Sequence, residues 1–131
     1  MTSSRRNFLV KSTAAAAAFG LPYMSYAADP IKLGSVLDTS GNFDAYGKPM
    51  DMATDLAIDE INKAGGLLGR KVAKVGYDTQ SNMALYTKFA QQLVRQDKVD
   101  VVIGSTTTPN SLAMMDVAVD NETPLISMAG S

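Results

Sequence analysis

Residues 99–111, which read VDVVIGSTTTPNS, combine a strand, a run of hydroxyl side chains and the start of a helix. Apart from Asp100, the first five are β-branched, as in a strand buried on both faces of a parallel sheet. After Gly104 come four hydroxyl residues: Ser105, Thr106, Thr107 and Thr108. Pro109 suits the first turn of a helix, where its missing N–H costs nothing. Free N–H groups, hydroxyls and the positive end of a helix dipole would therefore meet here, which favours binding of a small anion such as a carboxylate.

The same residues have a simpler interpretation, in which Thr108 only caps the following helix. Asp38, at the end of an earlier predicted strand, could likewise serve as a carboxylate in a site or merely cap its turn. Tyr46 lies between two small residues, where its ring could line the apolar wall of a ligand pocket. The neighbouring carboxylates Asp59 and Glu60 are best interpreted as solvated surface charges.

Hydrophobic periodicity predicts the elements that would position these residues. Strands are expected over residues 31–37, 71–77, 99–103 and 125–128, and helices over residues 50–64, 82–98 and 109–119. Ser81 or Asn82 would cap the second helix, and Lys98 would end it. The apolar faces predicted for the helices consist of Ala53, Leu56, Ala57, Ile61 and Ala64 in the first, Tyr86, Phe89, Ala90, Leu93 and Val94 in the second, and some of Leu112, Met115, Ala118 and Val119 in the third.

Alternating strands and helices indicate an α/β fold with a mostly parallel sheet, right-handed crossovers and helices on both faces. The expected strand order is 2-1-3-4. In this order the connections after the first and third strands leave toward opposite faces and open a crevice between them, where ligands of such sheets bind. The loops that border the crevice would be residues 38–49 and 104–108, which are rich in small and polar residues.

Several functions are disfavoured by what the sequence lacks. It has no histidine and no cysteine, and neither a GxGxxG nor a GxxxxGK[ST] loop, so we expect no enzymatic activity, no cofactor and no metal. Without the first 27 residues, three of the 12 basic residues are lost, and the remaining 9 face 13 acidic ones, a net charge of −4. A nucleic-acid partner would call for a basic surface instead.

The first 27 residues resemble a twin-arginine export signal. Arg5 and Arg6 precede a short apolar stretch over residues 14–21, which is well below the roughly 20 residues of a membrane-spanning helix. Ser25, Tyr26 and Ala27 supply a small-x-small cleavage pattern, so we expect cleavage after Ala27, with Ala28 as the second choice. Such a signal predicts export to the periplasm.

Residues 31–131 resemble the substrate-binding proteins of branched-chain amino acid ABC transporters, the leucine/isoleucine/valine-binding type of periplasmic binding protein. The matching segments are SGNFDAYG (40–47), ATDLAIDEINKAGGLLGRKV (53–72), YDTQSN (77–82), VVIGSTTTPNS (101–111) and PLISMAGS (124–131). The resemblance implies a periplasmic binding protein-like fold with two α/β lobes that close over a ligand. It also implies delivery of that ligand to a permease in the inner membrane, and a monomeric protein.

The resemblance also implies ligand-binding residues. The first-loop aromatic of the family falls on Tyr46, and the hydroxyl after the third strand falls on Thr108, within the run of Ser105, Thr106 and Thr107. The contacts after the fourth strand fall on Ala129, Gly130 and Ser131. Family members are much longer, so we expect residues 28–131 to form only part of the N-terminal lobe.

The ligand and the class of protein remain open at this stage. A small amino acid of the branched-chain type is the leading candidate, but binding proteins for urea and short-chain amides share several of these motifs, including a DTQSN-like loop. The ligand-sensing lobe of a periplasmic receptor has the same fold. An exported α/β enzyme is disfavoured by the missing histidine, cysteine and nucleotide loops.

Overall fold

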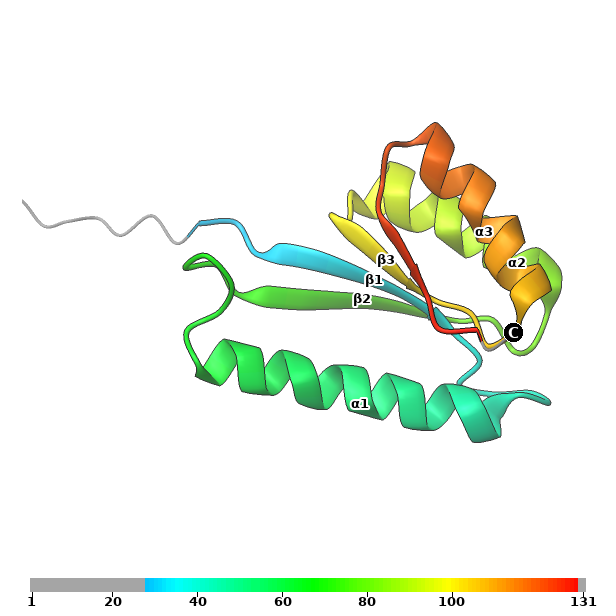
Figure 1. Ribbon diagram of the computed structural model, residues 1–131, viewed down its shortest axis with the longest axis horizontal. Coiled ribbons are helices and arrows are strands. Elements are labelled where there is room, and N and C mark those ends of the chain that lie inside the picture. Colours follow the sequence, from blue (N-terminus) through cyan, green and yellow to red (C-terminus); the bar gives the residue numbers. More distant parts are fainter. Residues whose placement is uncertain (1–27, 130–131) are drawn as a thin grey trace, which may run out of the picture.

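The computed structural model describes residues 28–129, which form a four-stranded parallel sheet with helices on both faces (Figure 1). The elements are β1 (Ile31–Leu37), α1 (Asp44–Lys63), β2 (Val72–Asp78), α2 (Met83–Gln92), η1 (Leu93–Asp97), β3 (Val101–Gly104), α3 (Thr108–Asp120) and β4 (Leu125–Ser127). The sheet order is β2-β1-β3-β4, and all three pairings are parallel. The predicted fold class and strand order are therefore confirmed, whereas the expected export signal lies outside the described residues.

The main core lies between the sheet and the layer formed by α2, η1 and α3. Tyr86, Ala90, Leu93 and Val94 are buried there against Val36 and Val102 of the sheet, and Phe89 packs against the cluster. The face predicted for the second helix is thus confirmed. The predicted ends of this helix are confirmed as well, because Asn82 accepts a hydrogen bond from the Ala84 N–H at its start and Lys98 closes the η1 segment with a left-handed backbone.

Helix α1 begins at Asp44, six residues before its predicted start. Pro49 was expected to precede the helix but lies inside it, where proline removes a single backbone hydrogen bond. The first turn of the helix lies before Pro49. It is closed by the N–H groups of Tyr46 and Gly47, which both donate to the Phe43 carbonyl oxygen. The predicted loop over residues 38–49 therefore shrinks to residues 38–43.

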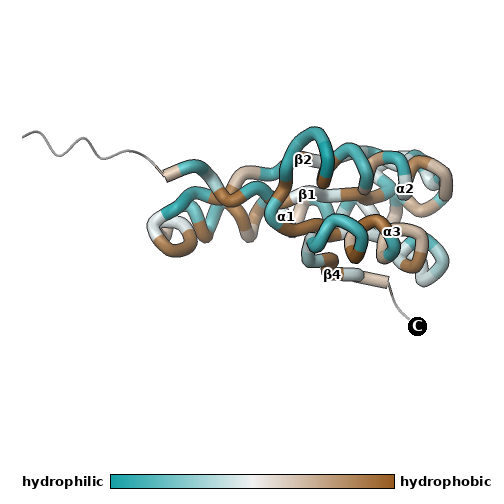
Figure 2. The backbone as a smooth tube through the Cα atoms, turned by 90° about the horizontal axis from the view of Figure 1, so that it is seen from above, coloured by the Kyte–Doolittle hydropathy of each residue, from teal (hydrophilic) through white to brown (hydrophobic). Residues whose placement is uncertain are grey.

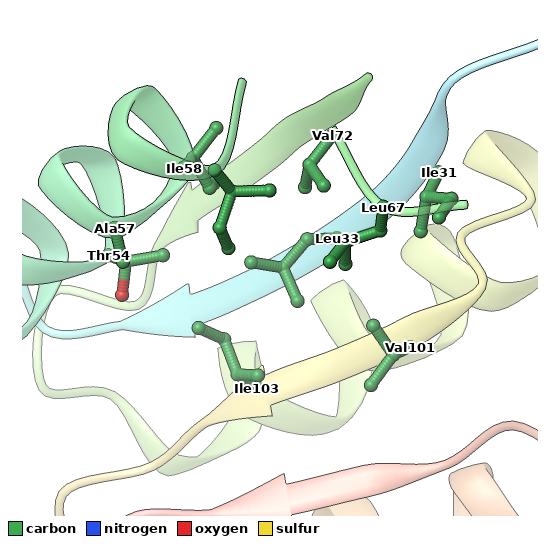
Figure 3. A pocket seen from close by; sticks show the side chains of 10 residues that line it. Ile31, Leu33, Thr54, Ala57, Ile58, Leu67, Val72, Val101 and Ile103 are labelled. Carbon is green, nitrogen blue, oxygen red and sulfur yellow. The ribbon is translucent and has the colours of Figure 1, made fainter. Parts of the chain in front are cut away.

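Two predicted helix faces were right only in part, since Ala57 and Ile61 of α1 line the cavity against the sheet and Ala118 of α3 is buried, as expected. Leu56 of α1, however, is 60% exposed, and Thr54 and Ile58, which were not predicted, turn to the sheet beside Ala57 (Figure 3). In α3 the buried residues are Met114, Val117 and Ala118, whereas Leu112, Met115 and Val119 are exposed. Helix α3 is only weakly amphipathic, so the period alone did not identify its inward side.

An apolar cavity of about 300 Å³ separates α1 from the sheet. Leu33, Val101 and Ile103 of the strands line it opposite Ile58 and Ala57 of the helix (Figure 3).

Hydrophobic and hydrophilic residues alternate along the helices (Figure 2). Within residues 28–129 none of the helices has the length and hydropathy that a membrane crossing requires.

Candidate functional site

The candidate site lies at the carboxyl edge of the sheet, between β1 and β3. These strands are neighbours, but β1 leads to α1 on one face and β3 leads to α3 on the other (Figure 1). The two connections diverge from adjacent strand ends, which is the predicted switch point of the sheet. Close approach of the two strand ends requires Gly104, because a Cβ atom there would lie 2.2 Å from the Val36 carbonyl oxygen.

The loop after β3 is shaped by its own hydroxyl groups. Ser105 is fully buried with a φ of 74°, and its Oγ donates to the Thr107 carbonyl oxygen at 2.6 Å and accepts from the Thr107 N–H at 3.2 Å. Thr106 Oγ1 donates to Asp38 Oδ2 at 2.6 Å. Both hydroxyl hydrogens are thus used within the protein, although a ligand role for either residue stays a prediction.

Helix α3 presents its N-terminus at this edge. Its N-cap is Thr107, whose side chain makes no capping hydrogen bond, and Thr108 is the first helical residue. The alternative that Thr108 is the N-cap is therefore wrong. Thr108 is exposed, as a ligand contact would require, and lies in the turn where the helix dipole is positive. Its ligand role stays a prediction.

The remaining predicted ligand residues come from α1 and from the segment after β4. Tyr46 is 64% exposed and belongs to the first turn of α1, not to a loop as predicted. The Ala129 N–H donates to Ser127 Oγ at 3.3 Å. Gly130 and Ser131 lie outside the described residues. The ligand roles of all four stay predictions.

Asp38 joins the loops of this edge, a role that sequence reasoning missed. Its carboxylate is 0% exposed and accepts hydrogen bonds from Thr79 Oγ1, from the Ser81 N–H at 2.9 Å, from Tyr86 Oη and from Thr106 Oγ1. Burial, together with the bond to Asp38, raises the pKa of Tyr86 and keeps it a phenol donor. The only sequence signal was an acidic residue directly after a buried strand.

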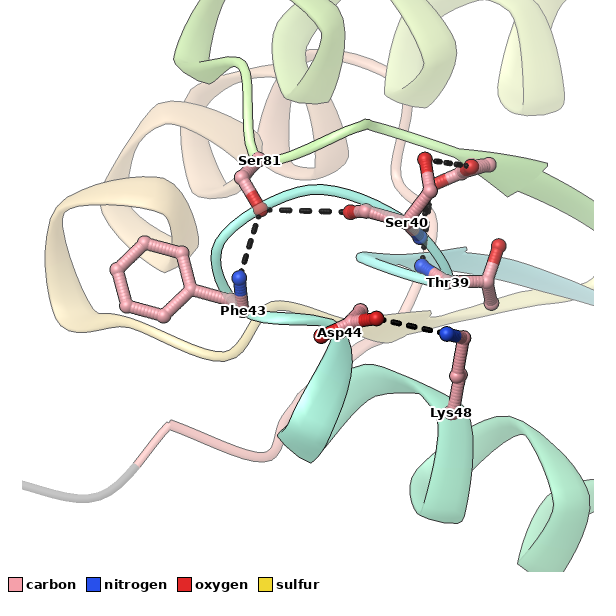
Figure 4. Close-up of polar contacts among 7 residues, drawn as sticks. Thr39, Ser40, Phe43, Asp44, Lys48 and Ser81 are labelled. Carbon is pink, nitrogen blue, oxygen red and sulfur yellow. Dashed lines mark hydrogen bonds and ion pairs between the residues drawn. The ribbon is translucent and has the colours of Figure 1, made fainter.

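A second carboxylate holds the loop between β1 and α1. Asp78 Oδ1 accepts the N–H groups of Thr39 and Ser40 at 3.0 and 3.1 Å, and Oδ2 accepts Ser40 Oγ at 2.6 Å. On the same loop the Phe43 N–H donates to Ser81 Oγ at 2.9 Å, and Lys48 pairs with Asp44 below it (Figure 4). Asp38 and Asp78 therefore fix the loops on both sides of β1.

The chemistry of this edge fits reversible binding of a small polar solute. Within residues 28–129 no cluster of three or more histidine, cysteine or acidic side chains is arranged to hold a metal ion. The groups that meet here are backbone amides, hydroxyls, a helix N-terminus and two carboxylates already supplied with donors. A parallel α/β lobe with such loops at its switch point defines a class, the solute-binding lobes of the α/β type.

Comparison with known proteins identifies the family within that class. Residues 30–131 match the model of the periplasmic binding protein family, and the chain belongs to this family. The chain is 31% identical over 113 residues to "Leu/Ile/Val-binding protein homolog 3" of Brucella melitensis, which covers 86% of the chain and 30% of that protein. It is 30% identical to the "Leucine-, isoleucine-, valine-, threonine-, and alanine-binding protein" of Pseudomonas aeruginosa, covering 87% of the chain and 30% of that protein.

Solved structures show the same fold. The branched-chain amino acid transporter substrate binding protein of Streptococcus pneumoniae, in complex with isoleucine, aligns with a TM-score of 0.75 and 36% identity. The alignment covers 78% of this chain and 30% of the Streptococcus pneumoniae protein. A solute binding protein of an ABC transporter from Rhodopseudomonas palustris, in complex with 3,4-dihydroxy benzoic acid, aligns with a TM-score of 0.70 and 30% identity, covering 79% of the chain and 28% of that protein. The chain thus spans about a third of the length of these relatives.

Proposed function

We propose that the chain is part of the solute-binding component of an ABC importer, which captures a small amino acid of the branched-chain type and passes it to the permease. The observation that carries this proposal is the match to an isoleucine complex at 36% identity across the described lobe. The exposed Thr108 at the start of α3 is where the ligand carboxylate would bind. The protein would act as a monomer and without chemical turnover.

The two named ligands of the structural relatives favour a carboxylate anchor. Isoleucine and 3,4-dihydroxybenzoic acid differ in size, shape and amino group, yet both carry a carboxylate. A helix N-terminus stabilises that group through its N–H donors and dipole. Aromatic carboxylic acids are therefore the second candidate ligands, whereas urea and short amides lack the anchored group.

The proposal also extends to export and to the surrounding molecule. We propose that residues 1–27 are a twin-arginine signal and that the mature protein works in the periplasm. Residues 28–131 would be part of the first of two lobes that close over the ligand. These points are supported by the Arg5–Arg6 pair in the sequence and by the family, whose members are periplasmic binding proteins.

Isothermal titration calorimetry of the full-length gene product tests the ligand class. We expect binding of isoleucine, leucine or valine, and loss of binding for isoleucinamide, which keeps the side chain and amino group but lacks the carboxylate. Binding of 3,4-dihydroxybenzoic acid alone would favour the second candidate. Binding of urea or acetamide without any carboxylic acid would overturn the carboxylate anchor, and turnover of the ligand would show that the protein is an enzyme.

The first prediction concerns Thr108. Thr108→Ala should weaken binding of the preferred ligand by about 1–3 kcal/mol, because a polar group of the bound ligand would lose its hydrogen-bond partner. Thr108→Ser is the matched control and should bind as the parent does, since it keeps the hydroxyl. Equal affinities of the parent and Thr108→Ala in calorimetry would show that this hydroxyl does not contact the ligand.

A further inference from the structure

We propose that Asp38 is a positioning residue that acts through Thr106 to fix the loop between β3 and α3. By holding this loop, the carboxylate would set the direction in which Thr107 and Thr108 meet the ligand. The inference rests on the proposed function for its ligand-binding consequence. Its effect on the loop itself does not depend on any ligand.

The environment of Asp38 supports this role. The carboxylate is fully buried, and its four donors come from three parts of the molecule: Thr79 and Ser81 from the β2–α2 loop, Tyr86 from α2, and Thr106 from the β3–α3 loop. The salt bridges of residues 28–129 do not include Asp38, so neutral donors alone stabilise its charge. Because a buried charge is costly without such bonds, each donor is held tightly to it.

The backbone of Asp38 is itself fixed, so the carboxylate can serve as a reference point. Asp38 follows β1 directly, and α1 packs on it through Gly47, where an added Cβ would lie 2.0 Å from the Asp38 carbonyl oxygen. The sheet pairing of β1 ends at Leu37, directly before this residue, and α1 packs against its carbonyl group. We therefore expect the loop that carries Thr106, and not Asp38, to shift when their bond is lost.

Thr106 transmits this position to the candidate site. It lies between Ser105, a buried residue with a φ of 74°, and Thr107, the N-cap of α3. A non-glycine residue with such a backbone persists only where its surroundings enforce it. The Thr106–Asp38 bond, at 2.6 Å, is an enforcing contact from outside the loop, whereas the bonds between Ser105 and Thr107 are local. Without it, the first turn of α3 would lose its orientation toward the crevice.

The test compares Thr106→Val, which keeps the shape but loses the hydroxyl, with Thr106→Ser, which restores the hydroxyl. Thr123→Val is the matched control, because Thr123 precedes β4 at the opposite edge of the sheet and its hydroxyl bonds only the Asn121 carbonyl oxygen. Asp38→Asn serves as a second variant. Each full-length variant is measured by calorimetry with isoleucine, by amide hydrogen exchange of residues 105–108 and by thermal unfolding.

We expect Thr106→Val to speed hydrogen exchange in residues 105–108 and to weaken isoleucine binding roughly ten- to hundredfold, as for loss of a bond to a buried charge. Thr106→Ser should recover both, and Thr123→Val should change neither. Asp38→Asn, where it folds, should reproduce Thr106→Val. The proposal is overturned if Thr106→Val matches Thr123→Val in exchange and affinity. If the parent protein does not bind isoleucine, the proposed function fails, and exchange in the loop alone decides the role of Asp38.

Discussion

Two aspartates, Asp38 and Asp78, lie at the ends of the neighbouring strands β1 and β2, and each takes hydrogen bonds from the loops beyond them. Asp38 binds the β2–α2 and β3–α3 loops, whereas Asp78 binds the β1–α1 loop and the Gln80 N–H. Because a carboxylate offers about four acceptor sites, one residue can hold a whole loop. At the residue scale, the geometry of the candidate site therefore depends on two side chains that we do not expect to touch the ligand.

The pH dependence of unfolding tests Asp78. Burial opposes ionisation, but hydrogen bonds from Ser40, Gln80 and Thr39 outweigh it and lower the pKa of Asp78 from 3.8. A group with a lowered folded-state pKa stabilises the fold above its unfolded-state pKa and loses that contribution as the pH falls through the folded-state value. Asp78→Asn should therefore reduce the free energy of unfolding clearly at about pH 6 but much less below about pH 3.

Urea unfolding at the two pH values measures this difference. Asp116→Asn, on the exposed surface of α3, is the control and should change stability by less than about 0.5 kcal/mol at both. A loss of stability in Asp78→Asn that is equal at both pH values would mean that the ionised carboxylate does not stabilise the loop.

Gly47 gives a second prediction at this scale. Replacing a helical glycine with alanine normally gains up to about 1 kcal/mol. Here the new Cβ would lie 2.0 Å from a backbone oxygen, which cannot move without shifting β1, so Gly47→Ala should destabilise the protein by about 1–3 kcal/mol. Gly76→Ala, whose Cβ would meet nothing nearer than 3.8 Å, is the control. Thermal or urea unfolding measures both variants, and a stabilised Gly47→Ala would disprove the steric argument.

At the scale of elements, α1 is joined to β2 by the side-chain amide of Asn62, which forms the two hydrogen bonds that a neighbouring strand would otherwise form. Asn62 Nδ2 donates to the Val72 carbonyl oxygen and Asn62 Oδ1 accepts from the Val72 N–H, both at 2.8 Å. At its middle the helix is tied to the same strand by Lys74, which pairs with Asp51 and Asp55. These contacts fix the helix over the sheet although a cavity separates much of its inner face from the strands.

Asn62→Ala should therefore lower the free energy of unfolding by about 1–2 kcal/mol, because the two backbone groups of buried Val72 would lose their partner. The better helix propensity of alanine offsets only part of this cost. Lys63→Ala is the neighbouring control: Lys63 is exposed and its pair with Asp59 is worth about 0.3–0.5 kcal/mol. Equal unfolding energies of the two variants would show that the Asn62 bonds contribute nothing.

Sequence patterns predicted the elements better than their ends and faces. The parallel pairing followed from the alternation of strands and helices, and the inner face of α2 and η1 followed from a strong period over residues 86–94. The apolar spacing indicates a helix only from Met50 on, and the features that permit the earlier start of α1, the Phe43 carbonyl and the close fit of Gly47, are not visible in a sequence pattern. For the site, the sequence located the hydroxyl loop but not the dependence of Thr106 on Asp38, because that bond joins residues 68 positions apart.

At the scale of the whole molecule, the two faces of the sheet are covered unequally. On one face α2, η1 and α3 form a continuous core with the strands, and on the other α1 leaves an apolar cavity of about 300 Å³. The candidate site opens at the edge where these two layers diverge. In the proposed function, the described residues would supply one wall of the ligand site.

This arrangement predicts weak binding by the 131-residue chain alone. Pockets for small molecules bury most of the ligand surface, and a single wall leaves one side of the ligand in water. We expect the chain to bind isoleucine at least roughly a hundredfold more weakly than the full-length gene product. Calorimetry on both proteins under identical conditions measures the ratio. Equal affinities would show that the described lobe holds the complete site.

The contacts of Arg70 determine how far the N-terminus can be shortened without loss of structure. Its Nε donates to the Asp29 carbonyl oxygen at 2.7 Å and its Nη2 to that of Pro30 at 3.3 Å, so the guanidinium clamps the stretch that leads into β1. A peptidase that cut after Ala27 or Ala28 would leave this clamp whole. A recombinant version that started at Ile31 would lack both acceptors of Arg70, and we expect the N-terminal end of β1 to separate from the sheet more readily.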